Sequence, residues 1–229
     1  MTEPAQLILD LPRLEALGRA DFIVGAPNAE AVAWIDRWPD WPRPALALAG
    51  PAGSGKSHLG CVWRKRSDAG MIDGAGLTEA GIEMLATAHR ALVIEAADAA
   101  PERPLLHLHN IAAERGLPLL LIAREPPARW GTALPDLASR LAALPVARIL
   151  PPDDGLIAAV LKKLFEERQV TPQPEALGYL VSHMERSFAA ANRLAAAIDA
   201  LSIARQRPIT VPLVRDVLAL DEAAEPLQG

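Results

Sequence analysis

The segment 50–57 constrains the fold of this chain more than any other. It reads Gly-Pro-Ala-Gly-Ser-Gly-Lys-Ser, which fits the pattern G-x-x-x-x-G-K-[S/T]. An apolar run over 45–49 precedes it, and a helical pattern begins near residue 57. The pattern therefore stands where a buried strand would turn into a helix, which is the setting that a phosphate-binding loop requires.

The chemistry of such a loop follows from its backbone. Glycines allow consecutive N–H groups to point inward at phosphate oxygens, and the helix N-terminus adds a partial positive charge. Lys56 is expected to reach the β- and γ-phosphates, and the Ser57 hydroxyl is expected to ligate Mg²⁺. His58 follows them and is included by its position, with no chemical role of its own. The other residues expected to bind the nucleotide are Gly50, Pro51, Ala52, Gly53, Ser54 and Gly55.

Composition narrows the class of protein. The chain has 229 residues, of which 51% are hydrophobic, enough for a sizeable core. Its net charge of −5 argues against a dedicated DNA-binding protein, which usually carries a basic face. No apolar stretch is long enough to span a membrane, and the N-terminus lacks the features of a signal peptide. The single cysteine, Cys61, excludes an intramolecular disulfide and a cysteine-based zinc site, and together these features fit a cytoplasmic protein.

Short apolar runs alternate with helical stretches from residue 45 to 150. This alternation predicts βαβ units and a mostly parallel sheet buried between helices. The pair Pro151-Pro152 marks a boundary, and beyond it the sequence shows helical patterns without strand patterns. The expected strands are 45–49, 69–73, 91–95, 118–123 and 146–150; the expected helices are 29–38, 57–67, 78–89, 103–115 and 134–143, followed by 153–168, 173–184, 187–206 and 211–220.

This layout, an α/β nucleotide-binding core with a small all-α lid, resembles that of AAA+ ATPases. In such proteins an acidic residue at the end of a neighbouring strand contributes to the Mg²⁺ shell, a role that falls here to Glu95. The next residue should be the acid that activates water, but it is Ala96, and Asp98 is out of register. The expected division of the chain is a tail over 1–20, a nucleotide-binding domain over 21–150, a lid over 151–220 and a frayed C-terminus over 221–229.

Several local motifs resemble the Hda family of DnaA-related replication regulators. The stretch 134–141, Leu-Pro-Asp-Leu-Ala-Ser-Arg-Leu, is similar to the arginine-finger segment of that family, and 124–129 is similar to the stretch after its sensor-1 strand. Arg186 matches the sensor-2 arginine. Residues 22–25 with Asn28 resemble the base-pocket segment, in which Ile23 would contact the nucleotide. The resemblance covers about 6–220, nearly the whole chain.

The N-terminal tail carries one further motif. Residues 6–11 read Gln-Leu-Ile-Leu-Asp-Leu and fit the pattern Q-L-x-L-x-L, which resembles the motif by which Hda and other proteins bind the DNA polymerase sliding clamp. An extended peptide with a glutamine amide and alternating leucines suits a hydrophobic surface pocket. Taken alone, the pattern is also that of an amphipathic strand. The resemblance implies clamp contacts by Gln6, Leu7, Leu9 and Leu11.

The resemblance also implies a function. Hda-family proteins are understood to bind nucleotide, dock on the clamp and promote hydrolysis of ATP bound to the initiator DnaA, which limits re-initiation of replication. Arg140 would then act in trans on the nucleotide of DnaA, with ADP or ATP and Mg²⁺ bound to the chain itself. The chain stops where an initiator would continue into a helix-turn-helix DNA-binding domain, which favours Hda over DnaA.

Three other functions stay open from the residues alone. The first is an autonomous AAA+ ATPase or DnaA-like loader, which would need a hydrolytic carboxylate such as Asp98. The second is a kinase that uses the same loop, and the third is a non-catalytic interaction protein with a structural nucleotide. The expected partners are the clamp and DnaA, with no membrane; a homodimer is left open.

Overall fold

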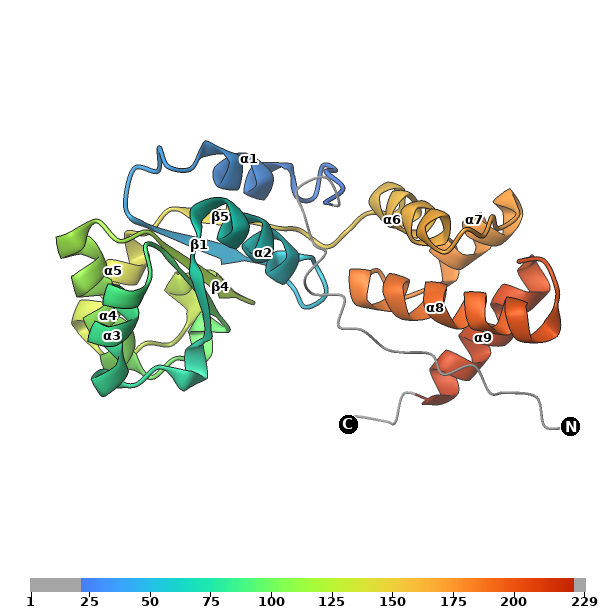
Figure 1. Cartoon of the computed structure of the whole chain (residues 1–229). Helices are drawn as coiled ribbons and strands as arrows, with labels where there is room; N and C mark the ends of the chain where they lie inside the picture. The colour runs from blue at the N-terminus through green and yellow to red at the C-terminus, as the bar shows by residue number, and fades with distance from the viewer. Residues whose placement is uncertain (1–21, 225–229) are drawn as a thin grey trace, which may run out of the picture.

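Figure 1 shows the computed structural model, which describes residues 22–224. Five parallel strands form one sheet in the order β2-β3-β4-β1-β5. Because β1 lies between β4 and β5, the chain after β1 leaves from inside the sheet and not from its edge. The strands are β1 (Ala45–Ala49), β2 (Gly70–Asp73), β3 (Leu92–Glu95), β4 (Leu119–Ala123) and β5 (Val146–Arg148).

Helices cover both faces of the sheet, as parallel strands require for their crossover connections. On β4, Leu120 and Ile122 pack toward α1 and α2, whereas Leu119 and Leu121 pack toward α3, α4 and α5. This alternation explains why a strand in the middle of the sheet is apolar at every position. The helices are α1 (Ala29–Arg37), α2 (Lys56–Ser67), α3 (Glu79–Ala88), α4 (Glu102–Arg115) and α5 (Pro135–Ala142), with short 3-10 turns η3 (Gly74–Gly76), η4 (Ala97–Ala99) and η5 (Pro127–Arg129).

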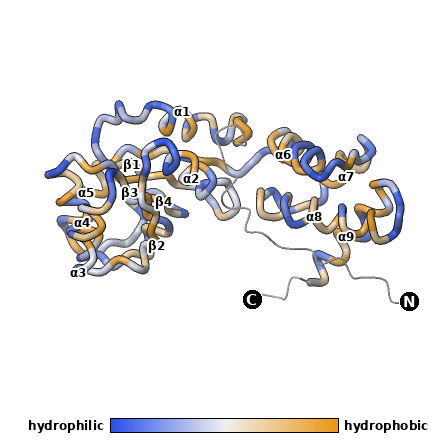
Figure 2. Tube along the Cα trace, in the orientation of Figure 1, coloured by the Kyte–Doolittle hydropathy of each residue, from blue (hydrophilic) through white to orange (hydrophobic). Residues whose placement is uncertain are grey.

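The chain beyond the sheet forms a helical lid with a core of its own. Phe165, Leu180, Leu194 and Val214 come from four different helices and are buried together. Figure 2 shows hydrophobic and hydrophilic positions alternating along these helices, whereas β1 is hydrophobic throughout. The α/β core with a helical lid is therefore confirmed. The lid helices are α6 (Asp154–Glu167), α7 (Pro174–His183), α8 (Phe188–Arg205) and α9 (Val211–Ala224).

Two element ends differ from the sequence-based expectation by more than one residue. The last strand stops at Arg148 and not at residue 150, because it is an edge strand and the Leu150 N–H turns away to bond the Pro27 carbonyl at 2.9 Å. The last helix continues to Ala224, so the expectation that 221–224 are frayed is wrong. Asp221 accepts hydrogen bonds of 2.7 and 2.9 Å from Arg193, which ties the end of α9 to α8.

Four of the five tryptophans lie together between α1, α2 and the start of β1. Trp63 is fully buried; the Trp41 ring stacks on it at 5.2 Å, and Trp38 meets it edge-on at 6.0 Å. The Trp41 indole N–H donates to the Trp34 carbonyl at 2.7 Å. Arg66 donates to three carbonyl oxygens at the end of α1, so this cluster holds α1 against α2. Within residues 22–224, none of the helices combines the length and apolar character that a membrane crossing requires.

Candidate functional site

The loop between β1 and α2 has the backbone geometry of an anion cradle. Gly53 and Gly55 adopt φ angles of 66° and 91°, a region that costs other residues about 1–2 kcal/mol. Gly50 is needed for a different reason, since a Cβ there would come within 2.6 Å of the Ile149 carbonyl oxygen. No side chain of the described residues caps α2, so the N–H groups of its first turn stay available to an anion.

Lys56 stands at the start of α2 with its ammonium turned back on the loop. Its Nζ donates to the Gly50 carbonyl at 2.7 Å and to the Pro51 carbonyl at 2.6 Å. Burial lowers the pKa of Lys56, Glu95 opposes this shift, and Arg124 adds to it. A phosphate group in the loop would supply the negative charge that this half-buried ammonium lacks.

Ser57 and Glu95 present the oxygen atoms expected of a magnesium site. The Ser57 hydroxyl donates to Oε2 of Glu95 at 3.3 Å, while Oε1 of Glu95 is buried and has no partner among the described residues. Burial raises the pKa of the Glu95 carboxyl, and the Ser57 bond and Lys56 oppose that shift. Hydroxyl and carboxylate oxygens suit Mg²⁺, which keeps several waters and substrate phosphates as its other ligands. These residues fit the ion, which would neutralise phosphate charge at this position.

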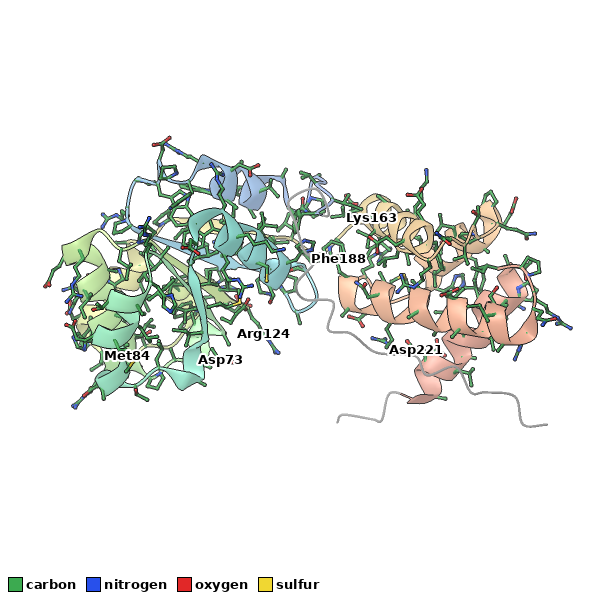
Figure 3. The ribbon with its side chains drawn as sticks, viewed as in Figure 1. Asp73, Met84, Arg124, Lys163, Phe188 and Asp221 are labelled. Carbon is green, nitrogen blue, oxygen red and sulfur yellow. The ribbon has the colours of Figure 1, made fainter. Side chains whose placement is uncertain are left out.

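The position after Glu95 carries no acid. Glu95 ends β3, in register with Asp73 of β2, and Ala96 follows with a left-handed φ of 45°. Asp98 lies on η4, exposed, but close enough to raise the pKa of Lys56. Arg124 follows β4 at the edge of the sheet domain that faces the lid (Figure 3). The carboxyl end of the sheet thus places one basic side chain, Arg124, and one acidic side chain, Asp98, near the loop.

The segment before α1 lies beside the loop. Asn28 is fully buried; its amide donates to the Ile23 carbonyl at 3.0 Å and its Oδ1 accepts from the Gly25 N–H at 2.9 Å. The Phe22 ring meets the His58 ring edge-on at 5.1 Å. Asn28 therefore shapes the turn that carries Ile23, and the ring pair places this turn next to the start of α2.

The lid makes direct contact with the phosphate loop through Phe188, a residue that sequence reasoning missed. The Phe188 N–H donates to the Gly53 carbonyl at 2.9 Å, and its ring would lie 3.0 Å from a Cβ placed on Gly55. Figure 3 shows Phe188 at the junction between sheet domain and lid. Ser187, which caps α8, lies against Gly53 as well. The one available signal was the place of Phe188 two residues after Arg186.

Arg186 forms an ion pair within the lid. Its Nε and Nη2 donate to the two carboxylate oxygens of Asp154 at 2.7 and 3.3 Å. The pair is exposed, and the hydrogen bond from Arg186 lowers the pKa of the Asp154 carboxyl. Ser187, the next residue, lies against Gly53 of the loop, and we propose that a bound phosphate and Asp154 compete for the Arg186 guanidinium.

We expect the substitution Asp154→Asn to raise the affinity for ADP by about two- to fivefold, the range of an exposed ion pair. The neutral amide releases Arg186 to a phosphate without breaking an ion pair. Calorimetric titration with ADP measures the change, and Glu175→Gln, at an exposed acid elsewhere in the lid, is the matched control. An affinity that stays unchanged or falls would exclude competition between Asp154 and the nucleotide.

Arg140 is not brought to this site. It lies on α5, where its Nε donates to Asp136 at 3.0 Å. Figure 1 places α5 on the side of the sheet domain away from the lid and from the start of α2. The structure thus gathers the loop, Ser57, Glu95, the Ile23 turn and the lid contact, and leaves Arg140 apart. Gln6, Leu7, Leu9 and Leu11 lie outside the described residues.

The helical lid matches a known protein family. Residues 154–218 match the family model of the Hda lid domain. The lid is similar to that of the Hda family. The match covers the lid alone, and the rest of the chain is compared through its fold.

Solved structures agree with this fold. Domain III of the Thermotoga maritima initiation protein DnaA superposes with a TM-score of 0.78 at 16% identity, covering 94% of this chain and 99% of that domain. DnaA bound to AMPPCP and single-stranded DNA gives 0.69 at 15% identity over 82% of this chain and 67% of that one. The Thermotoga maritima RuvB branch-migration motor gives 0.68 at 16% identity over 85% and 66%. At these identities the likeness shows only that the fold is similar, and it extends over both the sheet domain and the lid.

Proposed function

We propose that the chain is a cytoplasmic, nucleotide-binding regulator that promotes hydrolysis of ATP bound to DnaA and so limits re-initiation of replication. The observation that carries the proposal is the place of α5, the helix of Arg140, on the side of the sheet domain away from the start of α2 (Figure 1). It is combined with Ala96 at the position of the water-activating acid. A chain built in this way is poorly equipped to hydrolyse its own nucleotide but can offer a guanidinium to a neighbour.

The nucleotide bound to this chain would then have a structural role and not be a substrate. We propose ADP with Mg²⁺, held by the loop, Lys56, Ser57 and Glu95, with the base near Ile23 and a phosphate near Arg186. The contact of Phe188 with Gly53 supports this role, because a ligand in the loop bears directly on the lid. The proposal keeps the division between the nucleotide-binding domain, 21–150, and the lid, 151–220.

Arginine is the side chain that suits action in trans. A phosphoryl transition state spreads negative charge over its equatorial oxygens, and a planar guanidinium donates two parallel hydrogen bonds to such oxygens. The Arg140 side chain is partly exposed, 37%, so a neighbouring AAA+ protein can approach it. DnaA is proposed as that neighbour because the Hda lid and the DnaA-like fold both point to the same family of assemblies.

Docking on the sliding clamp is proposed from the sequence 6–11 alone. The test measures ATP hydrolysis by DnaA in the presence of clamp, DNA and this chain. Full stimulation is expected only when all components are present, and either Gln6→Ala or deletion of residues 1–11 should abolish both clamp binding and stimulation while the melting temperature stays unchanged. A truncated chain that still co-elutes with the clamp would show that the contact lies elsewhere.

An autonomous ATPase is the second candidate function. The observation in its favour is the electrostatic proximity of Asp98 to Lys56. If the isolated chain turns over ATP and Asp98→Asn abolishes that turnover, Asp98 is the catalytic acid and hydrolysis belongs to this chain. Absent or slow turnover in the isolated chain supports the regulator.

A further inference from the structure

The helix that carries Arg140 is anchored at its start by a carboxylate from another helix. Glu102, the first residue of α4, accepts from the Ala133 N–H at 2.7 Å with Oε1 and from the Leu134 N–H at 2.8 Å with Oε2. These two N–H groups immediately precede α5, where the backbone donors of a helix start lack intrahelical partners. Glu102 thereby joins the two residues just before α5 to the first turn of α4.

A second carboxylate acts on the arginine itself. Asp136 lies one turn before Arg140 on α5, and its Oδ1 accepts from Nε of Arg140 at 3.0 Å. Within residues 22–224, no acceptor engages the two terminal nitrogens of that guanidinium. Arg186 shows the contrast, since Asp154 takes both its Nε and one terminal nitrogen. Arg140 is therefore held through its Nε, and its two terminal nitrogens stay available to a ligand.

The surroundings leave this contact undisturbed. His109 of α4 lies near the pair, and burial first and then Arg140 lower the pKa of its imidazole, so His109 stays neutral at pH 7. Asp136 opposes this shift by raising the pKa of His109, but a neutral ring carries no positive charge that would compete with Arg140 for the Asp136 carboxylate. Arg43 is the other cation that acts on His109, and its side chain is exposed.

We propose that Asp136 is the positioning residue for Arg140: it orients the guanidinium so that the two outer nitrogens project toward a phosphate of the partner protein, on a helix whose start is held by Glu102. The proposal rests on the proposed function of Arg140. An arginine that is already oriented loses less side-chain freedom when it engages the phosphate, an effect worth about three- to tenfold in rate. The negative charge of Asp136 would act in the opposite direction, by weakening the attraction to phosphate, so the sign of the effect is informative.

The experiment compares Asp136→Ala, Asp136→Asn and Arg140→Ala in the DnaA hydrolysis assay with clamp and DNA. We expect Asp136→Ala to lower the maximal stimulated rate by about three- to tenfold, with the half-saturating concentration of the chain unchanged. Asp136→Asn keeps an oxygen that accepts from Nε and should recover part of the rate. Combining Asp136→Ala with Arg140→Ala should lower the rate no further than Arg140→Ala does alone, because the two residues act as one unit.

Glu125→Ala supplies the matched control, since Glu125 and Arg129 form an exposed pair of the same spacing at 3.1 Å. The positioning role is overturned if Asp136→Ala stimulates as well as or better than the wild type, or if Glu125→Ala causes the same loss. It is overturned as well if only the half-saturating concentration changes. Loss with Arg140→Ala but not with Asp136→Ala rejects the positioning role alone, whereas full stimulation by Arg140→Ala rejects the proposed function together with it.

Discussion

Replacing Arg140 with alanine is expected to return ATP hydrolysis by DnaA on clamp-loaded DNA to the rate measured without the chain. Arginine fingers supplied in trans contribute on the order of 10³–10⁵ in rate in other nucleotide hydrolases, so the loss should be complete within experimental precision. The ion pair with Asp136 is exposed and of i,i+4 spacing, which makes it worth only about 0.3–0.5 kcal/mol to stability. Unfolding therefore cannot account for such a loss.

Two further variants separate charge from geometry. Arg140→Lys keeps the positive charge but lacks the planar fork, and it should fail nearly as fully as alanine. Arg129→Ala removes an arginine from an equivalent exposed pair and should retain stimulation. Binding of ADP and clamp should be nearly unchanged in all three variants. Wild-type stimulation by Arg140→Ala would favour a scaffolding role for the chain.

Replacing Lys56 with alanine is expected to weaken ADP binding at least tenfold, about 1.4 kcal/mol. The ammonium is the one positively charged side chain of the motif, and its carbonyl partners hold it within the loop. Titration calorimetry of the nucleotide-free protein measures the affinity. Lys65→Ala, near the other end of the same helix, is the control and should bind ADP as the wild type does.

The stability of the same variant tests the physical interpretation. Lys56→Ala removes two hydrogen bonds but also a half-buried charge whose pKa is lowered by burial. These contributions oppose one another, so the free energy of unfolding without nucleotide should change by less than about 1 kcal/mol. A variant that loses affinity only because it unfolds, or one that binds ADP undiminished, would contradict the assignment of the loop.

Local patterns in the sequence were sufficient to predict the elements of the sheet domain and the lid. The apolar runs of β1 and β4 stand out because each strand is buried on both faces. The glycines of the loop are visible because left-handed and crowded backbone positions restrict the choice of residue. The end of α9 was predicted too early, because its last turn is stabilised by Arg193, which is 28 residues away from Asp221.

The contacts that complete the site were not predictable, because they join residues about 30 or more positions apart. Phe188 reaches Gly53 only through the way the lid packs on the sheet domain. The pair of Asp154 with Arg186 spans 32 positions, and the bond from Leu134 to Glu102 also spans 32. A single sequence carries no spacing rule for such pairs, whereas the i,i+4 pair of Asp136 and Arg140 lies within the reach of helix periodicity.

The tryptophans are confined to the sheet domain, so the unfolding of the sheet domain and that of the lid can be followed by different spectroscopic signals. All five tryptophans belong to the sheet domain, four of them in the cluster around Trp63, while the single tyrosine, Tyr179, belongs to α7 of the lid and stacks on His183. Indole emission therefore reports the packing of the sheet domain alone, and far-ultraviolet circular dichroism also records the helices of the lid. Coincident melting curves would mean one cooperative unit. A lid that melts first would lower the helical signal while the emission keeps its native value.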